Sequence, residues 1–241
     1  MIIKLLSSII FLSCISLFVS LGFWQLERAN EKELIVNLYH ERQLEEPENI
    51  FFIAKGDIKE KYYKKYKIKG RYINKNFLID NKIKNKVPGF NVITPFKLES
   101  SQELILVDRG WIPLEGKREN IVKNYQYLNF QKINEIVQEI NGYIYPREKS
   151  YTIGDISVNA DWPRLIQAID FNEIKDYIGE GDLLISDIVF RLGANNNFGF
   201  KREWEIISMD SNKHMGYAFQ WFSMAVALFI LVLIFIMRKK K

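Results

Sequence analysis

The chain has 241 residues, of which 48% are hydrophobic, and 34 Lys and Arg outnumber 29 Asp and Glu to give a formal net charge of +5. The length allows one or two domains. The single cysteine, Cys14, excludes a disulfide framework and a paired-thiolate metal site.

The first apolar run begins near the N-terminus. Twenty residues without a charge extend from Leu5 to Trp24, and as a helix they would span about 30 Å, the thickness of a bilayer's hydrocarbon core. A cleaved secretory signal is the alternative, since Lys4 supplies a positive start, but no small-x-small site precedes the charged stretch that follows. The FLSC sequence at Cys14 is a poor match to a lipoprotein cleavage site. We therefore predict an uncleaved transmembrane helix over residues 5–26.

Three side chains share one face where this helix leaves the apolar run. Trp24, Arg28 and Lys32 follow each other at intervals of four residues. The two cations are suited to the carboxylates of an amphiphile such as haem. They are equally suited to lipid phosphates or to pairing with Glu27 and Glu31, and from the residues alone both interpretations stay open.

The middle segment, residues 27–213, is rich in strand signals. The first helix is expected to continue through residues 34–42 and to end before Pro47. Beyond it, Ile, Val, Tyr and Phe gather in segments bounded by Gly, Asn and Pro. These segments are YKIKGRYI (66–73), NFLIDNKI (76–83), FNVITPFKL (90–98), ELILVDRGWI (103–112), VQEINGYIY (137–145), DIVFRL (187–192) and REWEIIS (202–208). The first two are expected to form a hairpin across residues 74–75.

One helix is expected among these strands. In residues 161–181, Phe171, Ile174, Tyr177 and Ile178 recur at helical spacing, and Gly179 is a typical stop. Six or seven strands with one helix predict a β-dominated α+β domain, built on an antiparallel sheet or a small barrel.

The second apolar run holds twenty-three uncharged residues from Met215 to Met237, followed by four basic residues. We predict a transmembrane helix over residues 214–237 and a basic tail over 238–241.

The distribution of charge predicts the topology. Only five of the 34 Lys and Arg, and none of the 29 Asp and Glu, lie outside residues 27–213, so the middle segment is neutral. Because Lys and Arg at helix ends favour the cytoplasmic side, we expect both termini in the cytoplasm and the central domain in the periplasm. A neutral domain also argues against nucleic acid as a partner. The lack of an Arg-rich, acidic-poor presequence favours a bacterial inner membrane over mitochondrial import.

The sequence offers no convincing enzyme site. Both histidines, His40 and His214, are expected close to the membrane, and the motifs GxSxG, HExxH, CxxC and the Gly-rich phosphate loop are absent. The helical pair Asp170 and Glu173 fits a solvated face. We therefore predict that the protein is not an enzyme.

His214 is the most informative residue, because it lies one position before the second apolar run. Tyr217, Ala218, Trp221 and Ala225 continue its face at helical spacing. A neutral imidazole can bind a metal, including haem iron, and the two alanines would leave room beside it for a flat ring. A histidine beside Tyr and Trp at a membrane interface is also typical of an aromatic belt. The residues alone leave both interpretations open.

Four motifs in this order resemble the Surfeit locus protein 1 family, and the resemblance spans the chain from end to end. They are Gly22-Trp24-Gln25-Arg28-Lys32, PGFNVITPF (88–96), VDRGWIP (107–113) and Asn212-His214-Tyr217-Trp221. The sequence departs from the family pattern at Met215, where Leu is common, and at Asp108, where Asn often precedes Arg-Gly.

The resemblance implies an assembly factor for haem-copper cytochrome c oxidase. It implies that His214 is an axial ligand to the iron of haem a, that Tyr217 and Trp221 shape the ring's site, and that Arg28 and Trp24 lie near it. The implied action is transient: haem a would be held and then handed to the catalytic subunit of the oxidase. Haem a synthesis enzymes and the lipid bilayer are further expected partners.

The resemblance implies no role for the Arg109-Gly110-Trp111 motif. From its residue types alone, we expect Gly110 to lie in a turn after a strand and Trp111 to be a buried anchor. Met215 offers a thioether as a conceivable second ligand.

Two other functions compete with haem delivery. One is a protein-only scaffold for oxidase subunits that binds no haem. The other is a two-span receptor, for which the four residues after the last span leave no signalling segment.

Overall fold

The computed structural model describes residues 2–49, 57–117, 120–130, 136–147, 161–179 and 188–238. The chain divides into two compact units. The helical unit consists of Met1–His40 with Glu205–Lys241, and the barrel unit consists of Glu41–Trp204.

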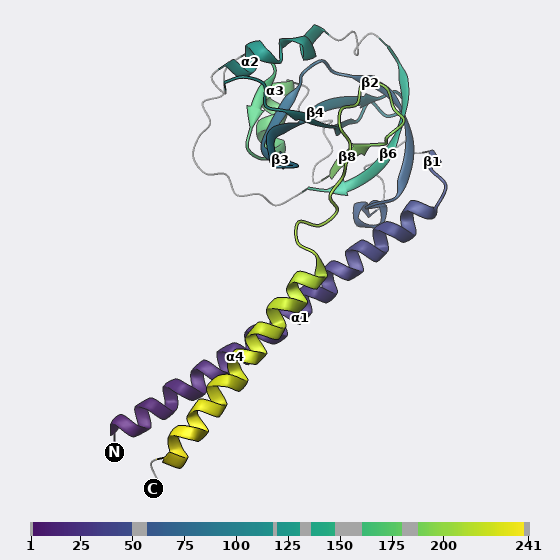
Figure 1. Ribbon diagram of the computed structural model, residues 1–241. Coiled ribbons are helices and arrows are strands. Elements are labelled where there is room, and N and C mark those ends of the chain that lie inside the picture. Colours follow the sequence, from purple (N-terminus) through teal and green to yellow (C-terminus); the bar gives the residue numbers. More distant parts are fainter. Residues whose placement is uncertain are drawn as a thin grey trace. The chain divides into compact units, whose positions relative to one another are not determined.

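Two long helices form the helical unit, α1 (Ile2–Leu44) and α4 (Ser211–Arg238). They lie side by side (Figure 1), and both are long and apolar enough to cross a membrane. Large apolar side chains such as Leu12 and Phe219 are 67% and 73% exposed, as lipid-facing side chains are expected to be. The two predicted apolar helices are confirmed, and they fit a membrane protein.

The end of α1 belongs to the barrel unit. The helix continues through residues 34–42, as predicted, and stops at Leu44. Its last turn is fixed by side chains, since Arg42 donates to the carbonyl oxygen of Tyr62 and Gln43 donates to that of Tyr63 at 2.9 Å. These bonds give the end of the helix a defined attachment.

A closed barrel of five strands forms the centre of the barrel unit. The strands are β2 (Lys65–Tyr72), β6 (Gln138–Pro146), β8 (Ile188–Leu192), β5 (Leu104–Pro113) and β4 (Val87–Leu98), in that spatial order, and β4 pairs again with β2. Only the β5–β8 pair within this ring is parallel. The predicted β-dominated domain with a small barrel is thus confirmed, and closure removes the unpaired edges of an open sheet.

Three further strands extend the barrel: β3 (Phe77–Lys84) pairs with β4, β7 (Arg164–Ile166) with β3, and β1 (Glu48–Asn49) with β2. The predicted hairpin between residues 66–73 and 76–83 is wrong, because β3 pairs with β4 and not with β2. Both β2 and β3 use the same edge of β4, one after the other along its twelve residues.

Two other expectations are corrected. The helix expected within residues 161–181 is shorter, because β7 takes residues 164–166 and only α3 (Phe171–Ile178) is helical. Residues 202–208 form no strand. Side chains replace the ladder there: Arg202 donates to the carbonyl oxygens of Gly193 and Asn196, and Trp204 donates to that of Leu192.

Apolar side chains from alternate positions fill three cores. The barrel interior holds side chains of all five strands, such as Ile68 and Phe190. A second core lies under α3, where Phe171, Ile174 and Ile178 are buried as their spacing predicts and Gly179 ends the helix in the left-handed region at φ 73°. The third core lies under α2 (Ile121–Asn124) and the 3₁₀ turn η3 (Gln126–Phe130). A second such turn, η1 (Ile58–Lys61), precedes β2.

Candidate functional site

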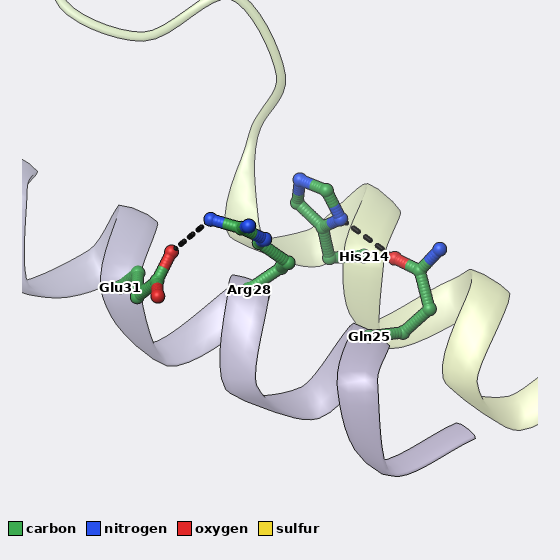
Figure 2. A network of polar contacts seen from close by, with 4 residues as sticks. All are labelled: Gln25, Arg28, Glu31 and His214. Carbon is green, nitrogen blue, oxygen red and sulfur yellow. Dashed lines mark hydrogen bonds and ion pairs between the residues drawn. The ribbon is translucent and has the colours of Figure 1, made fainter. Parts of the chain in front are cut away.

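His214 lies in the first turn of α4 and is bound to α1. Its Nδ1 atom is 2.7 Å from the Oε1 atom of Gln25 (Figure 2). Both residues belong to the helical unit, and His214 is only 9% exposed. The contact therefore joins the two apolar helices through a part-buried polar pair, in which loss of the hydrogen bond would be costly for the buried imidazole.

The partner of Nδ1 decides the tautomer of the imidazole. An amide oxygen only accepts, so Nδ1 carries the hydrogen and donates it to Gln25. The neutral ring then has its lone pair on Nε2, which points away from Gln25 in Figure 2. A histidine whose Nδ1–H is held by an oxygen acceptor is the usual form of a metal ligand. The donor chemistry of His214 is therefore that of a histidine able to bind a metal, including haem iron.

Arg28 lies one turn beyond Gln25 on α1. Its Nη1 atom is 2.6 Å from Oε2 of Glu31, and its guanidinium lies 5.7 Å from the centre of the Trp24 ring. Of the interpretations left open by the sequence, pairing with Glu31 is the one seen here. Both partners are 46% exposed. An ion pair this exposed contributes at most about 1 kcal/mol, so the guanidinium is able to exchange Glu31 for another anion.

The predicted aromatic residues face in several directions. Tyr217 and Trp24 are each 45% exposed, and Trp221 packs against Phe18 of α1 with ring centres 5.8 Å apart. The structure therefore brings Gln25 to His214, and places Trp221 in the contact between α1 and α4. Lys32 lies half-buried further along α1.

Small residues bring the two helices together. Ala218 and Ala225 are 1% and 5% exposed, so they are buried in the packing of α4, and the room expected beside them is not open space. A Cβ atom added to Gly22 of α1 would lie 2.6 Å from the ring of Phe222. Close approach of small residues is the usual basis of helix pairing in membranes.

The Arg109-Gly110-Trp111 motif lies in β5 and has a structural role. The guanidinium of Arg109 is fully buried, donates from Nε to the carbonyl oxygen of Phe198 at 2.7 Å, and lies 4.9 Å from the centre of the Phe200 ring. Its Nη1 atom also donates to Asn76 and Thr94, each at 3.3 Å. Burial lowers the pKa of Arg109 to about 10. Arg109 thus holds the segment that follows β8 against the barrel.

The other two residues of the motif hold the same segment. We expected Gly110 to lie in a turn after a strand, but it lies inside β5. Its φ of 115° and the carbonyl oxygen of Lys201, 2.8 Å from where a Cβ would be, leave no place for a side chain. Trp111 is buried as predicted; its backbone exchanges hydrogen bonds with Lys201, and its Nε1 donates to the carbonyl oxygen of Lys82.

Comparison with known proteins decides the family. The sequence model described as the SURF1 family matches residues 12–226, which is most of the chain and includes part of each long helix. The chain belongs to the SURF1 family. It is 28% identical to a SURF1-like protein of Rickettsia prowazekii (strain Madrid E), over 91% of this chain and 85% of that protein. It is 27% identical to a SURF1-like protein of Rickettsia felis, over 95% and 96% of the two chains.

Membership of the SURF1 family fixes the general function. The family is known in general as assembly factors for cytochrome c oxidase. Within the site, sequence reasoning placed Gln25 in a family motif but did not predict its contact with His214. The only available signal was its position at the charged edge of the first apolar run, level with the depth expected for His214.

Proposed function

We propose that this SURF1 protein assists oxidase assembly by holding haem a on Nε2 of His214 and passing it to the catalytic subunit. The observation that carries the proposal is the hydrogen bond from Nδ1 of His214 to Gln25, because it presents Nε2 as a lone-pair donor. Haem a, when bound, supplies an iron centre that accepts this lone pair.

The residues around His214 support a temporary hold. A single imidazole gives weaker attachment than a pair of ligands, which suits release to another protein. Arg28 is able to leave its exposed pair with Glu31 and bind a propionate in bidentate fashion. His214 is 9% exposed, so little of this residue is open to its surroundings. This burial favours loading and release at a partner protein over free exchange.

We also propose the location that the charges favour. Both termini lie in the cytoplasm, α1 and α4 cross a bacterial inner membrane, and the barrel unit lies in the periplasm. The excess of five positive charges outside residues 27–213 supports this orientation. Haem a synthesis enzymes on the same membrane would be the source of the cofactor.

The test is an optical spectrum of the purified protein after co-expression with haem a synthesis enzymes. The wild type is expected to show a haem a band that His214→Ala removes. His40→Ala is the matched control, since His40 is the other histidine and is exposed on α1. A band that survives His214→Ala would contradict the ligand assignment. Absence of a band from the wild type would favour the protein-only scaffold.

A further inference from the structure

The barrel unit contains a cavity of about 310 Å³. It lies on the outer face of the sheet, since Asp108 of β5 follows Leu104 and Leu106 on the face opposite the barrel interior. Five neighbouring strands contribute to it, β6, β8, β5, β4 and β3, together with the segment after β7. The size is that of small-molecule sites. Its lining includes Asp80, Lys82, Asn91, Asp108, Tyr145, Arg147, Ile169 and Arg191.

Irregular backbone shapes this cavity. The β3–β4 ladder shifts register between Ile79 and Lys82, and the β4–β5 ladder shifts between Asn91 and Ile93. Asn81, within the first irregularity, has a φ of 59°. Bulges re-aim side chains and are common beside binding sites, and a non-glycine residue at positive φ costs free energy that the rest of the fold must offset.

Asp108 is held rigidly in the cavity wall. It is 4% exposed; its Oδ2 accepts from Nδ2 of Asn91 at 2.8 Å, and its Oδ1 accepts from the backbone N–H of Gly110 at 3.1 Å. Burial raises the pKa of Asp108 above its ordinary value, although Arg191 and these hydrogen bonds oppose the rise.

Arg191 is a second ionisable side chain of the lining whose position is restricted. It is 7% exposed and is the register partner of Asp108 across the β5–β8 pair. Its guanidinium lies 3.4 Å from the centre of the Tyr145 ring and 5.2 Å from that of Trp204. Contacts with two aromatic rings restrict its orientation while leaving it charged.

The charged side chains of the lining give the cavity a net positive charge. Lys82, Arg147 and Arg191 supply three positive charges against two negative charges from Asp80 and Asp108, so the lining carries +1 when all are ionised. The lining also includes the apolar side chains of Ile79, Ile93, Ile169 and Val189.

We propose that this cavity binds a small organic anion, with its acid group facing Lys82, Arg147 and Arg191 and its hydrocarbon part against the isoleucine and valine wall. The ligand is a carboxylate or a phosphate monoester with a short apolar chain. The inference concerns the barrel unit alone and does not depend on the proposed role of His214.

The same lining predicts a pH dependence. The groups that face Asp108 are Arg191 of β8, Lys82 of β3 and Asn91 of β4, while Asp80 and Arg147 complete the charged lining. As the pH falls, protonation of Asp108 removes a negative charge and adds a hydrogen-bond donor. Anion binding should therefore tighten at lower pH, whereas a cation would bind more weakly.

Fluorine NMR of hexanoate tagged with a trifluoromethyl group tests the proposal, on the full chain in neutral detergent. Saturable broadening is expected, with competition by hexanoate and not by hexylammonium. Arg147→Glu should weaken binding about tenfold or more, whereas Lys67→Glu, an exposed lysine on β2 with the same charge change, should leave it unchanged. Both positions are exposed, so neither change threatens the fold.

A second cavity variant, a control variant and a further competition measurement complete the experiment. Ile169→Trp should fill the cavity and abolish binding, and His214→Ala should retain it. Stronger competition by dihexanoylphosphatidate than by hexanoate would identify a lipid phosphate, and the reverse order a soluble acid. The proposal is overturned by absence of saturable binding, by equal loss in Arg147→Glu and Lys67→Glu, or by effective competition from hexylammonium.

Discussion

The Nδ1 atom of His214 and the Oε1 atom of Gln25 form a hydrogen bond at 2.7 Å between residues 189 positions apart. The bond links the two apolar helices and at the same time selects the tautomer of the imidazole. One contact thus couples the pairing of α1 with α4 to the ability of His214 to bind a metal.

Gln25→Leu should therefore lower haem a retention about tenfold or more, in the range known for lost partners of ligating histidines. The reason is that Nδ1 loses its acceptor and the ring loses its fixed orientation. Gln25→Glu keeps an acceptor oxygen at the same place and should retain most of the band in the optical spectrum. Equal retention by the wild type and the Leu variant would refute a supporting role for Gln25.

Gly22→Leu should loosen the pairing of α1 with α4, because any Cβ at this position meets the Phe222 ring at 2.6 Å. Gly216→Leu is the control, since nothing lies within 4 Å of a Cβ added there. The measurement is the yield of a short bismaleimide cross-link between Phe18→Cys and Trp221→Cys, in a Cys14→Ser background. A yield that falls equally in both variants would show that Gly22 is not a packing point.

Arg109→Gln should destabilise the barrel unit by about 2–3 kcal/mol, because the shorter side chain loses the buried hydrogen bonds to Phe198, Asn76 and Thr94. For a unit of this size the expected fall in melting temperature is about 5–10 °C. Arg71→Gln, at an exposed position of β2, should change the melting temperature little. Thermal denaturation in detergent, followed by circular dichroism, measures both.

Gly110→Ala should cost more stability than Gly179→Ala, although both glycines have positive φ. At Gly179, with nothing within 4 Å, the cost is about 1–2 kcal/mol of backbone strain. At Gly110 the new methyl group also meets the carbonyl oxygen of Lys201 at 2.8 Å, so the segment after β8 must move. Limited proteolysis within residues 193–204 should therefore accelerate in Gly110→Ala alone; equal rates would contradict this account.

The stability of the barrel unit should depend on pH through Asp108. Because burial raises its pKa, the folded chain holds this proton at pH values where the unfolded chain has released it. Stability therefore falls as the pH rises through the raised pKa. In Asp108→Asn this loss is absent, so the melting temperature relative to wild type should increase as the pH rises above about 4, the ordinary pKa of an aspartate. A constant difference would exclude Asp108 as the responsible group.

Patterns of neighbouring residues in the sequence predicted the helices and strands that depend mainly on local interactions. The two uncharged runs gave α1 and α4, alternating apolar residues gave β2, and the spacing of Phe171, Ile174 and Ile178 gave α3 with its stop at Gly179. The short strands β1 and β7 escaped prediction, because two or three residues leave no period to detect.

The arrangement of the strands depends on pairing between segments that are far apart in the sequence. Nothing in the sequence indicated that β3 would pair with β4, or that β5 and β8 would meet in parallel some eighty positions apart. The site divides in the same way. His214 and Arg28 were predicted from their positions at the edges of the apolar runs, whereas the contact of His214 with Gln25 depends on how two distant helices pack.

The position of β8 in the barrel constrains how the protein is made. This strand lies between β5 and β6, which do not pair with each other, so the ring stays open until residues 188–192 are available. Only residues 193–210 separate β8 from α4. During synthesis, closure of the barrel and emergence of the second apolar helix must therefore come close together. A premature stop after β6 and before residue 188 would leave both β5 and β6 with exposed edges, a form prone to aggregation and to removal by proteases.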